Sequence, residues 1–97
     1  MSENVIKNKS FSFALRVVKL YKFLTQEKKE YVLSKQLLRS GTSVGALVRE
    51  AEQAESKLDF IHKLAIAQKE ANESDYWLEL LFKSEYLNDA QFESLKE

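Results

Sequence analysis

The sequence predicts an all-α fold, an antiparallel up-down-up-down four-helix bundle with a short or truncated fourth helix. Two observations carry this prediction. The 97 residues include no proline and only two glycines, the residues that tight β-turns need. Apolar residues also recur at alternating spacings of three and four, the pattern of helices packed lengthwise against one another. With 44% apolar residues we expect one domain over residues 1–97, with residues 1–9 disordered.

The first predicted helix starts at a cap on Ser10 or Ser12 and covers the run FSFALRVVKLYKFL. Its main apolar line has spacings of four, three and four: Phe13, Val17, Leu20 and Leu24. A second line lies beside it: Ala14, Val18 and Tyr21. Because apolar residues cover more than one narrow stripe, we expect burial on two sides, as in a bundle that also contacts another subunit.

The second predicted helix, from about Lys29 to about Ala54, has a centre of small residues. Each glycine inside a helix costs about 1 kcal/mol relative to alanine, so we expect a neighbouring helix to approach closely there. The residues that we predict to form a helix-packing or oligomer interface are Ser40, Gly41, Ser43, Gly45, Arg49 and Glu50. The sequence leaves open whether Arg49 is structural or contacts a ligand.

The third predicted helix runs from about Lys57 to about Ser84. Ser56 and Asp59 precede and open it with the spacing of a capping box, which implies a sharp reversal and an antiparallel second and third helix. That pairing is expected to place three small residues near the centre of the second helix: Ala65, Ala67 and Ala71.

The fourth predicted helix is capped by Asn88 or Asp89 and is short. It is too short to cover its neighbours. We therefore expect either that the chain is a truncated version of something longer, ending at Glu97, or that another subunit fills the groove.

Charge is divided unevenly along the chain, with a net +7 in residues 1–49 and a net −7 in residues 50–97. Three interpretations are open: a basic face for an anionic partner, complementary faces for self-assembly, or antiparallel helices that neutralise one another. The candidate nucleic-acid-binding residues lie on the faces of the first two helices: Arg16, Lys19, Lys22, Lys28, Lys35 and Arg39. An ordinary solvated helix surface is the alternative interpretation of the same residues.

The sequence offers little catalytic chemistry. Asp59 and His62 form a single acid-x-x-His pair, whereas a di-metal bundle needs such a pair from two helices, so we predict no metal site. No phosphate-binding, dinucleotide or nucleophile motif occurs, and we predict no cofactor and no enzymatic activity. Cysteine is absent and no apolar run is long enough for a membrane span, so we expect a cytoplasmic protein with no membrane partner.

Ordered motifs resemble one known family. The residues that match a Q-L-x-R-[SA]-x-x-S-[IV] pattern are Gln36, Leu37, Arg39, Ser40, Ser43 and Val44, and Phe60 to Ala67 match F-[IL]-x-x-L-x-I-A. Over about residues 10–95 the chain resembles the 23S rRNA intervening-sequence proteins. Leu47 departs from that pattern, since the family usually has Asn there.

The resemblance implies an antiparallel four-helix bundle, often a homopentamer, with a longer fourth helix than this chain has. A related protein, the accessory variability determinant of diversity-generating retroelements, shares the fold and binds nucleic acid and a reverse transcriptase. We therefore expect a non-enzymatic bundle that self-assembles into a homo-oligomer, with a pentamer as the state that the resemblance implies. We also expect it to bind RNA or a nucleic-acid-processing protein. The alternative is a purely structural or protein-interaction module.

Overall fold

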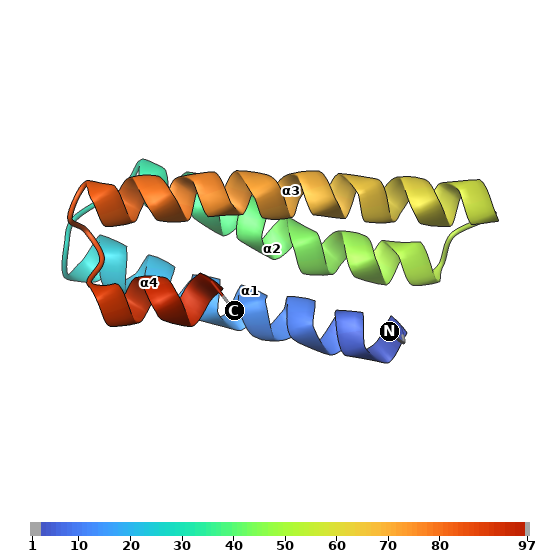
Figure 1. Ribbon diagram of the computed structural model, residues 1–97, viewed down its shortest axis with the longest axis horizontal. Helices are drawn as coiled ribbons and strands as arrows, with labels where there is room; N and C mark the ends of the chain where they lie inside the picture. The colour runs from blue at the N-terminus through green and yellow to red at the C-terminus, as the bar shows by residue number, and fades with distance from the viewer. Residues whose placement is uncertain (1–2, 97) are drawn as a thin grey trace.

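The computed structural model describes residues 3–96, and they form four helices: α1 (Glu3–Gln26), α2 (Leu33–Glu52), α3 (Lys57–Lys83) and α4 (Asp89–Lys96). Successive helices reverse direction and lie side by side in a rod of 44 × 22 × 20 Å (Figure 1). The fold prediction is confirmed, including the short fourth helix.

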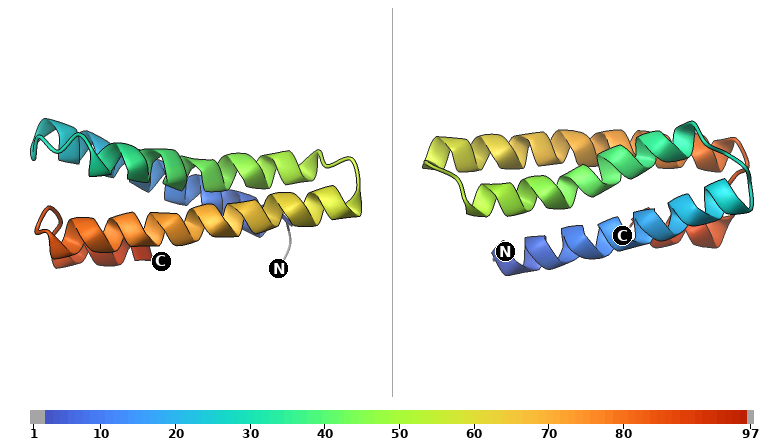
Figure 2. Two further views of the ribbon diagram at one scale, coloured as in Figure 1. Left: turned by 90° about the horizontal axis from the view of Figure 1, so that it is seen from above. Right: turned by 180° about the vertical axis from the view of Figure 1, so that it is seen from behind.

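Helix α2 lies between α1 and α3 and packs along both of them. Within residues 3–96, α1 and α3 do not pack directly against each other. Helix α4 packs against α3 and α1 at one end of the rod, where it lies alongside the later half of α1 (Figures 1 and 2). Within residues 3–96, α4 therefore covers only part of the side of the bundle between α1 and α3.

The buried core is concentrated at the end that α4 covers. Its residues come from all four helices and the loop before α4: Val17, Leu20, Leu24, Leu37, Leu78, Leu81, Leu87 and Leu95. Phe92 of α4 stacks on Phe82 of α3 with ring centroids 4.3 Å apart. Burial of these large side chains at one end fixes α4 in place, since burying one Leu or Phe side chain contributes about 1.5–3 kcal/mol.

The small residues of α2 allow a close helix contact, as predicted, but the glycines face α1 rather than α3. A Cβ added to Gly41 would lie 2.9 Å from a γ-carbon of Val17, and one added to Gly45 would lie 3.4 Å from the carbonyl oxygen of Ser10. The contact between the centres of α2 and α3 is instead polar. There the buried hydroxyl of Ser74 donates to that of Ser40 at 2.9 Å.

Two helix starts differ from the prediction. Helix α1 begins at Glu3, so Ser10 and Ser12 lie inside it, and residues 3–9, predicted to be disordered, form its first turns. Residues 1–2 of that predicted segment lie outside the described residues. Helix α2 begins at Leu33 rather than near Lys29, because Lys29 has a positive φ of 56° that no helix accommodates.

The caps of the other two helices are confirmed. The Ser56 hydroxyl accepts from the backbone N–H of Asp59 at 3.0 Å, and the Asp59 carboxylate accepts from the N–H of Glu55 at 3.2 Å. At the start of α4, the side chain of Asn88 accepts from the N–H of Gln91 at 2.8 Å, and Gln91 accepts in return from the N–H of Asn88 at 2.9 Å. Each exchange satisfies N–H groups that the first turn of a helix leaves unpaired.

Candidate functional site

The predicted basic residue Arg39 is occupied by contacts within the chain. Its guanidinium donates to the carboxylate of Glu70 at 3.1 Å and also pairs with that of Glu73, both on α3. The indole N–H of Trp77 donates to Glu73 at 3.0 Å. The hydrogen bond from Trp77 and that from Arg39 lower the pKa of Glu73, and the hydrogen bond to Glu73 raises the pKa of Arg39. The charge of Arg39 is thus balanced by two carboxylates.

Arg16 points toward the side of α1 that faces α3. Its Nε is fully buried and has no hydrogen-bond partner among residues 3–96. Lys19 and Lys22 lie on the exposed surface of α1. Arg16 and Lys19 nevertheless share part of one surface, since both line an open pocket between α1 and α4.

The remaining two predicted residues lie near the α1–α2 connection. Lys28 is exposed with its ammonium 5.9 Å from the ring centre of Phe23, and Lys35 is exposed in the first turn of α2. Within the described part of the chain, no carboxylate lies within 4.0 Å of the ammonium groups of Lys19, Lys22, Lys28 or Lys35. The structure thus shows no ion pair at these four lysines, and their nucleic-acid role stays a prediction.

The predicted interface residues of α2 have three kinds of environment. Ser40, Gly41 and Gly45 face the neighbouring helices of the same chain. Ser43 donates its hydroxyl back to the carbonyl of Arg39 at 2.6 Å, which lets it lie in the helix without a partner side chain. The other two are near the surface: Glu50 pairs with Lys63 of α3 at 3.2 Å, and Arg49 is exposed.

Arg49 belongs to an apolar surface on the outside of α1 and α2. Its guanidinium lies 5.2 Å from the ring centre of Phe11, a cation–π contact that joins the two helices. Phe11 is 49% exposed, Leu15 is 57% exposed, and Val18 is half-buried. Spacings of four and three place the three apolar residues on one face of α1. We call Phe11, Leu15, Val18 and Arg49 the outer α1 surface.

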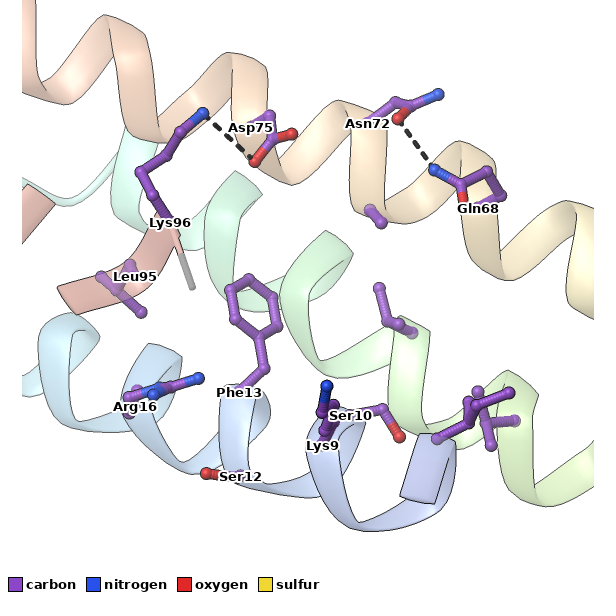
Figure 3. A pocket seen from close by; sticks show the side chains of 14 residues that line it. Lys9, Ser10, Ser12, Phe13, Arg16, Gln68, Asn72, Asp75, Leu95 and Lys96 are labelled. Atoms are coloured by element: carbon purple, nitrogen blue, oxygen red, sulfur yellow. Dashed lines mark hydrogen bonds and ion pairs between the residues drawn. The ribbon is translucent and has the colours of Figure 1, made fainter. Parts of the chain in front are cut away.

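On the opposite side of α1 an open groove of about 790 Å³ runs between α1 and α3. We call it the α1–α3 groove. Figure 3 shows Phe13 and Arg16 of α1 on one side, Gln68, Asn72 and Asp75 of α3 on the other, and Leu95 of α4 at one end. Its floor includes Val44 and Val48 of α2. It is a mainly apolar trough with polar rims.

Asp59 and His62, the acid-x-x-His pair of the sequence, do not form a site with each other. Asp59 caps α3, and His62 is exposed. Residues 3–96 contain no group of three or more His, Asp or Glu side chains placed to hold a metal ion. None of the helices in that range has the length and hydropathy needed to cross a membrane.

A buried carboxylate that sequence reasoning missed shapes the start of α2. Glu30 accepts from the backbone N–H groups of Val32 at 3.1 Å, Leu33 at 2.8 Å and Ser34 at 2.7 Å. Its burial raises the pKa, but the three N–H donors and the Ser34 hydroxyl outweigh that effect, so the pKa is lowered. One feature of the sequence could have indicated this role: Glu30 lies three residues before the start of α2, and α2 has no Ser, Thr, Asp or Asn at its N-cap.

The comparisons with known proteins agree with this architecture. The pattern described as "23S rRNA-intervening sequence protein" matches residues 2–97. The chain belongs to the 23S rRNA-intervening sequence protein family. A crystal structure of a protein of unknown function from the S23 ribosomal protein family of Bacteroides thetaiotaomicron is 63% identical, with a TM-score of 0.95. The match covers 98% of this chain and 85% of that one. Among curated proteins none matches the chain.

Proposed function

We propose that this member of the 23S rRNA-intervening sequence protein family is a non-enzymatic module that self-assembles through the outer α1 surface. The observation that carries the proposal is the exposure of Phe11 and Leu15, 49% and 57%, on a helix whose other side already buries Val17 and Leu24 completely. A helix needs only one apolar stripe to join its own bundle. The second stripe supports a second contact.

The chemistry of this surface is that of a protein interface. Aromatic residues and arginine are enriched at the centres of interfaces, where their large side chains exclude water. Arg49 covers one face of the Phe11 ring, and within residues 3–96 it has no carboxylate within 4.0 Å. In an assembly, a carboxylate from the acidic half of a neighbouring copy would complete its pairing.

Sedimentation velocity on Leu15→Lys, with Leu58→Lys as its matched control, tests this proposal. Both leucines are exposed, Leu58 at 80% at the start of α3, so neither change removes core packing. We expect the wild-type chain to sediment as an oligomer at micromolar concentration, Leu15→Lys to shift it to the monomer, and Leu58→Lys to leave it unchanged. A monomeric wild-type protein, or equal effects of the two variants, would contradict the proposal.

RNA binding is the second candidate function, supported by the four exposed, unpaired lysines and by the family description. The test is RNA affinity measured across a salt series, with Lys22→Glu/Lys35→Glu compared with Lys69→Glu/Lys83→Glu on α3. The two double variants have the same net charge, and all four lysines are exposed.

If Lys22 and Lys35 contact phosphates, their reversal weakens binding and lowers the slope of log K against log salt by about 1.4, at about 0.7 for each phosphate on a single strand. The α3 variant should keep the wild-type slope. No binding at low salt, or equal losses in both variants, would remove this function. Self-assembly is measured separately, so the two candidates can fail independently.

A further inference from the structure

A second exposed apolar surface lies on the outside of α3. Tyr76 is 59% exposed there, and its ring meets that of Trp77 edge-on, with centroids 5.0 Å apart. It lies two residues from Ser74 and from Leu78, both completely buried, and so on the opposite side of the helix from them. Trp77 and Leu80, which lies one turn beyond Tyr76, are half-buried. We call Tyr76, Trp77 and Leu80 the outer α3 surface.

Helix α4 packs on a different side of α3. Phe92 stacks on Phe82, and Lys96 lies 3.8 Å from Asp75. Asp75 and Tyr76 are one residue apart, which turns the two side chains about 100° from each other around the helix. A helix in the line of α4, of whatever length, therefore leaves Tyr76 uncovered.

The charges beside the outer α3 surface are negative. The residues one turn before and after Tyr76 include Glu73 and Glu79. In residues 3–96 no Lys or Arg nitrogen lies within 4.0 Å of the Glu79 carboxylate, and Glu73 pairs with a cation of α2 that it shares with a second carboxylate. The lysines on the same face of α3, Lys69 and Lys83, are each two turns away. A cation that approaches Tyr76 from outside is therefore favoured.

The outer α1 surface carries the opposite charge. Lys19 lies one turn beyond Leu15, and Arg49 of α2 lies against the ring of Phe11. Neither cation has a carboxylate within 4.0 Å among the described residues. The residues one turn from Phe11 or Leu15 include no acid. The two surfaces thus match: both have an apolar centre, with cations beside one and carboxylates beside the other.

We propose that the outer α1 surface of one copy binds the outer α3 surface of a second copy of this chain, in a head-to-tail contact. This inference rests on the proposed self-assembly and names the surface that it uses on the partner copy. The apolar side chains of the two surfaces pack on each other, and Lys19 and Arg49 lie near the carboxylates beside Tyr76. A symmetric contact of the outer α1 surface with itself would instead bring like charges together and leave them without carboxylates.

The two surfaces lie at nearly the same height on two helices that α2 separates. Adjacent residues of α2 contact Val17 of α1 and bond to Ser74 of α3. Val17 and Ser74 are therefore level with each other, in helices that run in the same direction (Figure 1). Leu15 and Tyr76, two residues before and after them, differ in height by about 6 Å, at 1.5 Å per residue. One copy can thus hold a neighbour at each surface, so that assembly extends beyond a dimer.

Sedimentation velocity on Tyr76→Lys, with Tyr31→Lys as its matched control, tests the outer α3 surface. The two tyrosines are exposed to almost the same extent, 59% and 57%, and Tyr31 lies in the loop between α1 and α2. Tyr76→Lys should raise the apparent dissociation constant of the assembly by about thirtyfold or more, as the loss of a central aromatic side chain does, and Tyr31→Lys should leave it unchanged. Thermal melts of each variant confirm that it is folded.

Mixing two variants identifies which surfaces pair. Leu15→Lys retains an intact outer α3 surface, and Tyr76→Lys retains an intact outer α1 surface. In a head-to-tail assembly these two monomeric variants should combine into a dimer with one copy of each, and stop there because the two remaining surfaces are both damaged. The mixture is followed to about tenfold above the concentration at which the wild-type chain assembles, because a single contact lacks the strength of several. A chain that carries both changes should stay monomeric with either variant.

The results separate this inference from the self-assembly on which it rests. If the wild-type chain is monomeric, both fail. If Leu15→Lys is monomeric but Tyr76→Lys assembles like the wild type, self-assembly stands and the outer α3 surface is not the partner. Equal losses in Tyr76→Lys and Tyr31→Lys, or a mixture of Leu15→Lys and Tyr76→Lys that stays monomeric, would also overturn the inference.

Discussion

Replacement of Gly41 by alanine measures how closely α1 and α2 approach. The new Cβ would lie 2.9 and 3.0 Å from the two γ-carbons of Val17, closer than side chains tolerate. Val17 is completely buried, and its β-branched side chain has few rotamers through which to move away. Alanine gains about 1 kcal/mol of helix propensity over glycine, whereas overpacking costs about 1–3 kcal/mol. Gly41→Ala should therefore lower the free energy of unfolding by about 0–2 kcal/mol.

Gly45→Ala is the matched control, one turn further along the same helix. Its Cβ would meet the carbonyl oxygen of Ser10 at 3.4 Å and two further Ser10 atoms at 3.6 and 3.7 Å, which are ordinary contacts. This variant should keep the propensity gain and raise the free energy of unfolding by up to about 1 kcal/mol. The two alanine variants should thus differ by about 1–3 kcal/mol. For a chain of this size that corresponds to a difference of at least about 4 °C in Tm.

Urea and thermal unfolding, followed by circular dichroism, would measure both variants at the same pH and protein concentration. A further variant isolates the contact: in a Val17→Ala background the γ-carbons are gone, so Gly41→Ala should become stabilising by up to about 1 kcal/mol. If Gly41→Ala and Gly45→Ala stabilise the chain equally, the steric reasoning and the close packing of α1 on α2 at Val17 are both refuted.

Two further predictions concern polar groups inside the bundle. Glu30→Gln should destabilise the chain by about 1–3 kcal/mol at pH 7, because an amide accepts the three N–H donors less strongly than a carboxylate. In the folded chain the pKa of Glu30 is lowered from 4.5, so the wild type exceeds the variant in free energy of unfolding by the full amount above pH 4.5, and by less as the pH falls through the folded pKa. A pH series of urea melts measures this difference in free energy of unfolding. A difference that stays constant with pH would contradict the prediction. Ser40→Ala and Ser74→Ala should each lower the free energy of unfolding by about 1 kcal/mol. The double variant should lower it by less than the sum of the two, because the same hydrogen bond at 2.9 Å is lost in all three variants. Additive effects in urea melts would show that the two hydroxyls are not coupled.

Much of the fold follows from local rules that the sequence displays directly. The capping box of Ser56 and Asp59 set the start of α3, and the spacing of apolar residues set the faces of the long helices. The start of α1 was missed because Ser10 looks like a cap, yet its hydroxyl donates to the carbonyl of Lys7, three residues earlier in a continuing helix. Such back-bonding lets serine lie within a helix, so serine alone does not mark a boundary.

The sequence could not predict which helix packs against the glycines of α2. Small residues permit a close approach, but they do not specify which neighbouring helix makes it. Periodicity places Gly41 and Ser40 on adjacent sides of α2, and either side could have met α3. The structure divides them, with Gly41 against Val17 of α1 and Ser40 bonded to Ser74 of α3. The pairing of Arg39 with Glu70 and Glu73 was missed for a similar reason, because ion pairs between helices depend on their relative register, which the sequence does not state.

Within residues 3–96, the first half of α1 packs against α2 alone. Over residues 3–96, α1 packs on α2 and on α4 alone, and α4 lies beside only its later half. Its earlier turns are joined to α2 by the close contact of Ser10 with Gly45, the Lys7–Glu52 pair at 3.5 Å and the Phe11–Arg49 contact. Exposed ion pairs contribute about 0–1 kcal/mol each, so this segment should open locally more often than the core.

Amide hydrogen exchange tests this consequence together with the proposed self-assembly. Amides of residues 5–12 should exchange faster than those of residues 74–81 in α3, whose buried side chains include Leu78 and Leu81. Assembly through the outer α1 surface should slow exchange in residues 5–12 as protein concentration rises, and Leu15→Lys should remove that effect. Equal protection of both segments in the free monomer would show that α1 is already held firmly by α2, and that self-assembly is not needed to order it.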